Sequence, residues 1–206
     1  MYRTASGNAI LAVDTDRRIG RFSFLTLRDL VGWLILARHF GLPTRLLDWS
    51  MSPLVALFFA VEDHDDADGA LWALNPGHLN YDTIQEHRLM IFDDPRVREL
   101  IALAFEPDPS PHLESLPRTE GRALAVGARE IDPRVMAQQG AFTIHADENN
   151  LAERRIEGYT WLVGFRIKNT AKPIRENLSR LGITRSSLFP DLGSLAYDIK
   201  HKPWAN

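Results

Sequence analysis

The segment at residues 38–63, RHFGLPTRLLDWSMSPLVALFFAVED, places a charged and aromatic turn between two strongly apolar stretches. Pro43 disfavours helix at the residue before it, and the six residues after it are typical of a short strand that enters a turn. Ser52 followed by Pro53 forms a good N-cap and first helical turn. Because residues 54–61 are apolar on nearly every face, the helix that follows is predicted to be buried. The predicted local unit is therefore strand, turn and buried helix.

The remaining sequence predicts one domain of mixed helices and strands. With 206 residues, 45% of them hydrophobic, the chain can form one sizeable core but is too short for two ordinary domains. We expect a single α+β domain over residues 1–206, with residues 1–25 as its N-terminal segment and the proline-rich residues 106–121 as an exposed loop. Amphipathic patterns predict helices at residues 27–39, 95–105, 173–181 and 190–200, and apolar runs predict strands at residues 70–74 (ended by Asn75-Pro76-Gly77), 124–126, 142–145 and 159–167.

Composition excludes several classes of protein. A formal net charge of -3 provides no overall basic field, which argues against nucleic-acid or anionic-membrane binding as the main activity. The absence of cysteine excludes disulfide frameworks, Cys-ligated zinc and thiol nucleophiles. The longest apolar run, residues 53–61, is far shorter than the roughly 20 residues that span a bilayer. No signal peptide is visible in residues 1–13, so we expect a cytoplasmic protein without a membrane partner.

Familiar phosphate-binding and nucleophile signatures are missing from the sequence. There is no Gly-rich loop that ends in Lys-Ser/Thr, and no G-x-G-x-x-G, G-x-S-x-G or H-E-x-x-H motif. The acidic segment with His64, Asp65, Asp66 and Asp68 lacks both the EF-hand spacing and its closing glutamate. A solvated loop is the favoured interpretation of this segment, and the sequence predicts no metal site.

Arg45, Asp48 and Trp49 are more specific candidates. Residues three apart on a strand point to opposite faces, so we expect Arg45 and Asp48 to have separate partners. The Arg45 guanidinium suits a carboxylate or a diphosphate, and the Trp49 indole offers a flat face to a ring. In the structural alternative, Arg45 and Asp48 tie the strand to neighbouring backbone while Trp49 fills core. Residue types alone favour that alternative.

A second group of polar residues precedes the strand predicted at residues 142–145. Gln138 and Gln139 are adjacent and should face different ways, so that one can point toward a ligand while the other caps the turn. A neutral amide can orient a ligand but cannot act as a general base. Gln139 alone is therefore not a convincing catalytic residue.

Taken together, these segments resemble the FRG-domain family, a group of mostly bacterial and phage proteins. The resemblance covers about residues 33–200 and departs from the family pattern at the N-terminus, where Tyr2-Arg3-Thr4 is the one candidate for the Phe-Arg-Gly motif and lacks its glycine. Arg3 is therefore as consistent with a terminal residue of no function as with a binding role. The matching segments read HFGLPTRLLDWS (residues 39–50), SPLVALFFA (52–60), QQGAF (138–142) and SLFPDL (187–192).

This resemblance implies an ADP-ribosyltransferase-like fold, with NAD in a cleft between two small sheets flanked by helices. Arg45 or Arg3 would hold the phosphates, Trp49 and Phe59 would border the nicotinamide, and Gln139 would take the place of the usual glutamate. An amide at that position supplies little charge stabilisation, so activity could be weak, could depend on Asp48, or could be absent. The implied catalytic residues are Arg45, Asp48 and Gln139, and the implied NAD-binding residues are Arg3, His39, Thr44, Trp49, Ser50 and Phe59.

Three hypotheses of function follow from this resemblance. The first is an effector, such as a toxin or a phage-defence component, that consumes NAD or modifies a protein or nucleic acid. The second is a non-catalytic module that binds a nucleotide or a protein. The third is an interaction domain without a small-molecule site, in which Arg45 and Asp48 would be buried and paired with each other or with backbone.

Overall fold

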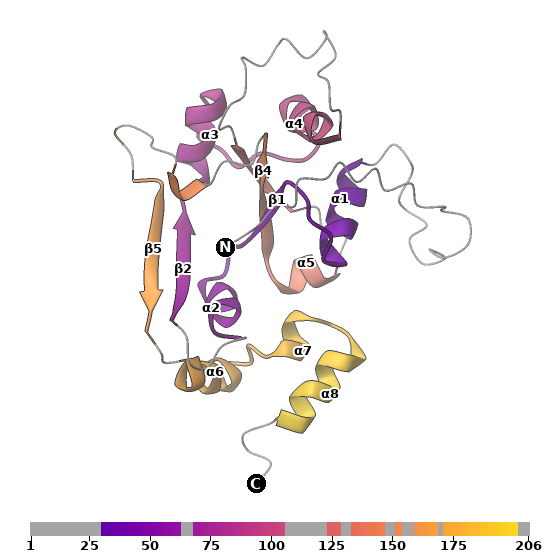
Figure 1. The fold of residues 1–206 in the computed structure, drawn as a ribbon, viewed down its shortest axis with the longest axis vertical. Coiled ribbons are helices and arrows are strands. Elements are labelled where there is room, and N and C mark those ends of the chain that lie inside the picture. The colour runs from indigo at the N-terminus through magenta and orange to yellow at the C-terminus, as the bar shows by residue number, and fades with distance from the viewer. Residues whose placement is uncertain are drawn as a thin grey trace, which may run out of the picture.

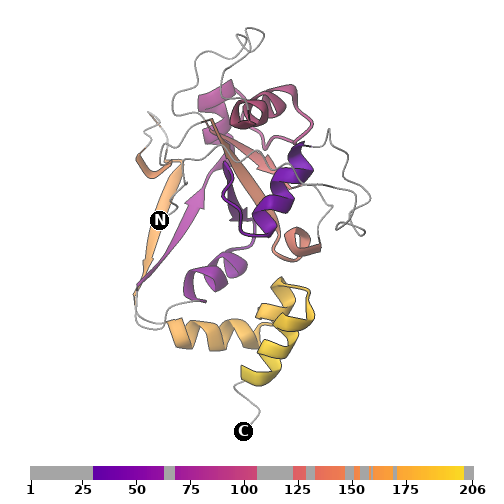
Figure 2. The same ribbon diagram turned by 45° about the vertical axis from the view of Figure 1, so that its right-hand side comes forward.

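The chain combines helices and strands in the computed structural model, which describes residues 30–62, 68–105, 123–128, 133–146, 151–153, 158, 160–168 and 171–201 (Figures 1 and 2). In chain order the elements are α1 (Leu30–His39), β1 (Leu46–Ser50), α2 (Pro53–Val61), β2 (Gly69–Leu74), α3 (Pro76–Ile84), α4 (Pro95–Phe105), β3 (Ala123–Gly127), α5 (Pro133–Ala137), β4 (Gly140–His145), the short 3₁₀ turn η2 (Leu151–Glu153), β5 (Leu162–Ile167), α6 (Ala171–Arg180), α7 (Arg185–Leu188) and α8 (Leu192–His201).

The strands form two small sheets, as the resemblance implied, and both sheets are antiparallel. The three-stranded sheet has the order β1-β4-β3, and the two-stranded sheet pairs β2 with β5. Each sheet joins strands that are distant in sequence. In Figure 1 the two-stranded sheet lies on one side of β1 and β4, while α1 and α4 lie on the other side.

The two faces of the three-stranded sheet are buried against different elements. Side chains alternate between the faces of a strand, so Leu46, Phe142 and Ile144 share the face that packs against apolar residues of α1 and α4. Ala123 and Ala125 occupy the other face, which packs against α3, the end of β2 and the start of β5. The second cluster contains Leu79, Ala123, Ala125, Leu151 and Trp161, with Leu47, Trp49, Leu74 and Leu162 packed against it.

Helix α2 packs in a third cluster and corrects one prediction. Ser52 caps it as predicted, accepting a hydrogen bond from the Val55 amide at 3.4 Å. Its buried side chains are Val55, Phe58 and Val61, which pack with residues of α6 and α7. The prediction that α2 is buried holds for one side only, because its neighbours cover that side and leave Leu54 and Phe59 exposed.

Other predicted elements were confirmed, and three helices were missed. The helices predicted at residues 95–105 and 173–181 are present, and Gly182 ends the second in a left-handed conformation, φ +81°. Asn75 both ends β2 and caps α3, where its side chain accepts from the His78 amide at 3.1 Å. Helices α3, α5 and α7 were not predicted. The predicted loop at residues 106–121 and the first turn of the helix predicted at residues 27–39 lie outside the described residues.

Hydrogen bonds of the Asn80 side chain join the connection between α3 and α4 to β3. This fully buried side chain accepts from the Ala125 amide at 2.7 Å and donates to the Ala125 and Arg88 carbonyls at 2.9 and 2.7 Å. Met90 extends the sheet beyond β3 by a parallel bridge to Val126. A buried amide with all of its partners fixes the path of the chain at this point.

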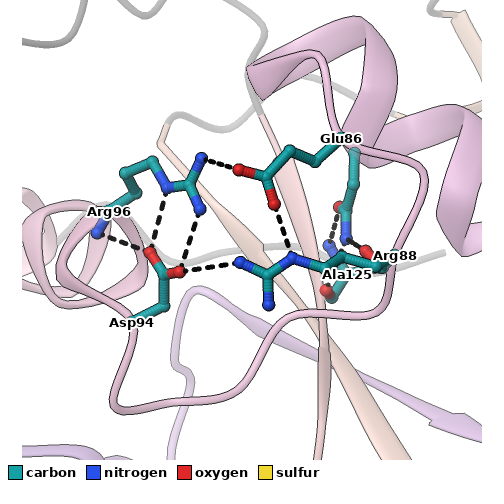
Figure 3. A network of polar contacts seen from close by, with 6 residues as sticks. Glu86, Arg88, Asp94, Arg96 and Ala125 are labelled. Atoms are coloured by element: carbon teal, nitrogen blue, oxygen red, sulfur yellow. Dashed lines mark hydrogen bonds and ion pairs between the residues drawn. The ribbon is translucent and has the colours of Figure 1, made fainter.

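Four charged residues surround this connection (Figure 3). Arg96 contacts Asp94 at 2.9 Å and Glu86 at 2.7 Å, and Arg88 contacts Asp94 at 3.4 Å and also pairs with Glu86. Hydrogen bonds from the Arg96 guanidinium are the main cause of a lowered pKa at both carboxyl groups. The same bonds raise the pKa of Arg96.

Within the described part of the chain, none of the helices has the length and apolar character needed to cross a membrane.

Candidate functional site

The β1–β4 ladder carries most of the predicted site, and it separates Arg45 from Gln139. At one end the His145 amide donates to the Arg45 carbonyl at 3.0 Å, and at the other end the Met51 amide donates to the Gln139 carbonyl at 2.9 Å. Ser50 is the register partner of Gly140. With about 3.3 Å per strand residue, Arg45 and Gln139 are on the order of 20 Å apart along the ladder. The two residues therefore do not share one end of the site.

A chain of polar contacts crosses the face of β1 and β4 that looks toward the two-stranded sheet. The Trp49 Nε1–H donates to the Thr143 hydroxyl at 3.1 Å, and that hydroxyl also contacts His145 Nε2 at 2.8 Å. Thr143 is fully buried, whereas Trp49 and His145 are half-buried. A threonine hydroxyl that accepts from an indole can donate its own proton to an imidazole, which would then be neutral with its proton on Nδ1. Thr143 thus links an aromatic ring to a titratable group.

Arg45 lies at the His145 end of this face. Leu46 pairs with Ile144, so the next pair along the ladder is Arg45 with His145. Because side chains alternate along a strand, Arg45 lies on the same face as Trp49. Its Nη1 donates to the Ala146 carbonyl. An arginine carries five N–H donors, so one backbone bond orients the guanidinium and leaves further donors for other acceptors.

Asp48 lies on the opposite face of β1. Its carboxylate pairs with the Arg38 guanidinium of α1 at 2.7 Å, and the Asp48 side chain is 51% exposed. The prediction that Arg45 and Asp48 have separate partners is confirmed, because one contacts backbone and the other contacts α1. Asp48 also does not match the interaction-domain hypothesis, which requires it to be buried and paired with Arg45 or with backbone.

At the far end of the ladder, the two adjacent glutamines face different ways as predicted. Gln138 is half-buried: its carbonyl accepts from the Ser50 hydroxyl at 2.8 Å, and its side chain donates to the Leu188 carbonyl at 3.1 Å. Gln139 is exposed and adopts a left-handed backbone conformation, φ +48°. Gln138 is thus the structural member of the pair, and the Gln139 side chain lies at the surface.

Phe59 belongs to a cluster different from that of Trp49. Its ring contacts Phe189 edge-on, with centroids 5.9 Å apart, and it is 41% exposed. Phe189 in turn lies under the guanidinium of Arg134 at 4.5 Å and that of Arg185 at 5.0 Å. The two rings predicted to border a nicotinamide therefore pack in different parts of the domain.

The remaining predicted residues have local roles or are not described. The Thr44 hydroxyl accepts from the Leu46 amide at 3.3 Å at the entry to β1. His39 ends α1, but its side chain lies outside the described residues, as does Arg3. Among the residues that the structure describes, no group of three or more His, Asp or Glu side chains could hold a metal ion.

Sequence reasoning missed Thr143 and His145, although a signal was present. The segment GAFTIH alternates small or polar residues with apolar ones, so Ala141, Thr143 and His145 share one face of β4. Because β4 pairs with β1, these residues lie on the same face of the sheet as Trp49.

One comparison with known proteins is informative. The family model of the FRG domain matches residues 13–69, a segment that includes α1, β1 and α2. The match confirms the resemblance to the FRG domain over residues 13–69, and the segments at residues 138–142 and 187–192 lie outside it. Neither the curated proteins nor the solved structures contain a match to the chain.

Proposed function

We propose that this chain, which matches the FRG-domain family model over residues 13–69, binds NAD or a closely related nucleotide at the face of β1 and β4 that carries Arg45, Trp49, Thr143 and His145. The single observation behind this proposal is the hydrogen-bonded chain from Trp49 through Thr143 to His145, with Arg45 at its end. A guanidinium suits a diphosphate, and an indole suits the face of a base.

An ADP-ribosyltransferase-like reaction is the leading hypothesis for this site. In such a reaction the bond between nicotinamide and ribose C1′ breaks, nicotinamide leaves with the electron pair, and water or a nucleophile of a protein or nucleic acid adds to C1′. The proton of that nucleophile must pass to a base, and in this proposal His145 Nε2 takes it in place of the hydrogen bond that it accepts from the Thr143 hydroxyl. An effector in the cytoplasm, such as a toxin or a phage-defence component, would use this chemistry.

A non-catalytic nucleotide- or protein-binding module is the alternative, and one observation favours it. In the transfer reaction a carboxylate would stabilise the positive charge that develops on ribose. The Asp48 carboxylate, however, pairs with Arg38 on the opposite face of β1. Gln139 is an amide and lies at the far end of the ladder. The binding step of the proposal therefore has stronger support than the transfer step.

Binding and turnover are tested separately. Calorimetric titration of the full chain with NAD and with ADP-ribose should show binding that Arg45→Ala weakens at least tenfold, the loss expected for one charge-assisted contact worth about 1.5 kcal/mol or more. Arg98→Ala is the matched control, since Arg98 is an exposed arginine on α4 that pairs with Asp93. Equal affinity in wild type and Arg45→Ala would contradict the proposed site.

Turnover is measured with NAD labelled in its adenosine moiety, incubated with the protein alone, with nucleic acid and with cell lysate. Release of nicotinamide or transfer of label that His145→Asn abolishes would support the transferase. Binding without either product would support the module. Absence of both binding and turnover would contradict both hypotheses.

A further inference from the structure

Helix α8 has its apolar stripe on the side that faces away from the domain. Leu192, Leu195 and Ile199 follow one another at helical spacing, and their exposed fractions are 84%, 46% and 58%. In Figures 1 and 2 the helix lies beyond α6 and α7, far from both sheets. An amphipathic helix normally turns this kind of stripe toward a core. The stripe on α8 is therefore available to a partner.

The inward side of α8 is held by polar contacts. Ser194 is 5% exposed, and its hydroxyl and amide both donate to Asp191. The Asp198 carboxylate accepts from the Ser186 amide of α7 at 2.7 Å. The Asp191–Ser194 bonds lie within the first turn of α8, whereas the bond between Ser186 and Asp198 joins α8 to α7. Rotating the helix to bury its leucines would break the bond to α7.

The stripe is self-complementary about the midpoint between Leu195 and Ala196. A two-fold axis through that midpoint pairs Leu192 of one helix with Ile199 of a second, antiparallel helix. It also sets the large Leu195 against the small Ala196. Large side chains opposite small ones are what close packing of two helices requires.

Charge follows the same symmetry. The exposed Asp191 stands at the start of α8, and the exposed Lys200 stands in its last turn. The two-fold that pairs the apolar residues sets Asp191 of one copy opposite Lys200 of the other. Antiparallel helices also place the negative end of one macrodipole beside the positive end of the other. Apolar contacts and charges therefore select the same antiparallel pairing.

We propose that α8 is an isologous docking surface for a second copy of this chain, packed antiparallel along the stripe of Leu192, Leu195, Ala196 and Ile199. In a two-fold interface the same patch serves both partners, and this stripe meets that condition by its residue order. The contact involves a helix of ten residues, so it is small for a dimer interface. We expect a dissociation constant on the order of tens of micromolar.

Sedimentation velocity of the full chain over a wide range of protein concentration tests the proposal. The wild type should shift from monomer to dimer as concentration rises. Leu192→Glu with Ile199→Glu should remain monomeric, with a dissociation constant raised at least tenfold, because two pairs of carboxylates would enter the contact. Met136→Glu is the matched control, since Met136 is an exposed apolar side chain on α5. Thermal unfolding of each variant establishes that it is folded.

Cysteine cross-linking tests the orientation. The chain has no cysteine, so Leu192→Cys with Ile199→Cys introduces the only thiols. Antiparallel packing predicts oxidation of 192 to 199 between copies, identified by mass spectrometry of the linked peptides. Leu181→Cys, at an exposed position outside α8, should not give a specific dimer.

Three outcomes would overturn the proposal. A wild type that stays monomeric at several hundred micromolar, far above the expected dissociation constant, would show that the stripe does not bind a second copy of this chain. A dimer that survives the two glutamate substitutions would lie elsewhere. Links of 192 to 192 and 199 to 199 would show parallel packing instead.

Discussion

The indole of Trp49 and the hydroxyl of Thr143 are joined by a hydrogen bond of 3.1 Å across the diagonal between β1 and β4. The two residues are far apart in sequence and meet because β1 pairs with β4. The bond fixes the plane of the ring that the proposed site presents to a nucleotide, and it connects that ring to His145.

Thr143→Val should lower the free energy of unfolding by about 1–3 kcal/mol, because it removes the hydroxyl and leaves the Trp49 N–H without its acceptor. Denaturant unfolding measures the change. Thr143→Ser keeps the hydroxyl and serves as the control, with a smaller loss expected from the missing methyl group. A Val variant as stable as the wild type would show that the bond contributes nothing to the fold.

Asn80→Ala should be among the most damaging substitutions in the chain, with a loss of about 3 kcal/mol or more, because it leaves three buried hydrogen bonds unmade. Asn177→Ala is its control, since Asn177 is exposed on α6 and should change stability by less than about 0.5 kcal/mol. Equal unfolding midpoints for the two variants would contradict the role given to Asn80.

Stability should fall in acid through Glu86 and Asp94, whose pKa values are lowered chiefly by hydrogen bonds from Arg96. A carboxyl group with a lowered folded pKa binds fewer protons in the native state than in the unfolded state. Its contribution is therefore fully present above its ordinary unfolded pKa near 4 and is lost as pH falls through the lower folded value.

Arg96→Gln tests this assignment. Its difference in unfolding free energy from the wild type should be largest at pH 7 and should shrink from about pH 5 downward, as both carboxyl groups become protonated. Denaturant unfolding at intervals between pH 7 and pH 3 measures it. A difference that is constant over this range would contradict the assignment.

The sequence was sufficient for local features and insufficient for pairing. The cap at Ser52, the stop at Gly182 and the opposite faces of Arg45 and Asp48 depend on neighbouring residues and on the two-residue period of a strand, so they could be predicted. Asn75-Pro76 is equally typical of a strand end and a helix start, so α3 was missed.

The partners of the site residues could not be predicted in the same way. Arg38 reaches Asp48 from a separate helix, and Thr143 reaches Trp49 from a strand paired only in the folded chain. The exposure of Phe59 likewise depends on which side of α2 the helices α6 and α7 cover. These relationships arise from tertiary packing, which the residue pattern of one segment does not encode.

Substitutions on the two faces of β1 test whether NAD binds on the Trp49 side. Calorimetric titration of NAD should be repeated with Arg45→Gln, which alters that side, and with Arg38→Gln, which removes the partner of Asp48 on the other side. Arg45→Gln should weaken binding at least tenfold, while Arg38→Gln should bind NAD as the wild type does. Weakened binding in Arg38→Gln with unchanged binding in Arg45→Gln would contradict binding on the Trp49 side.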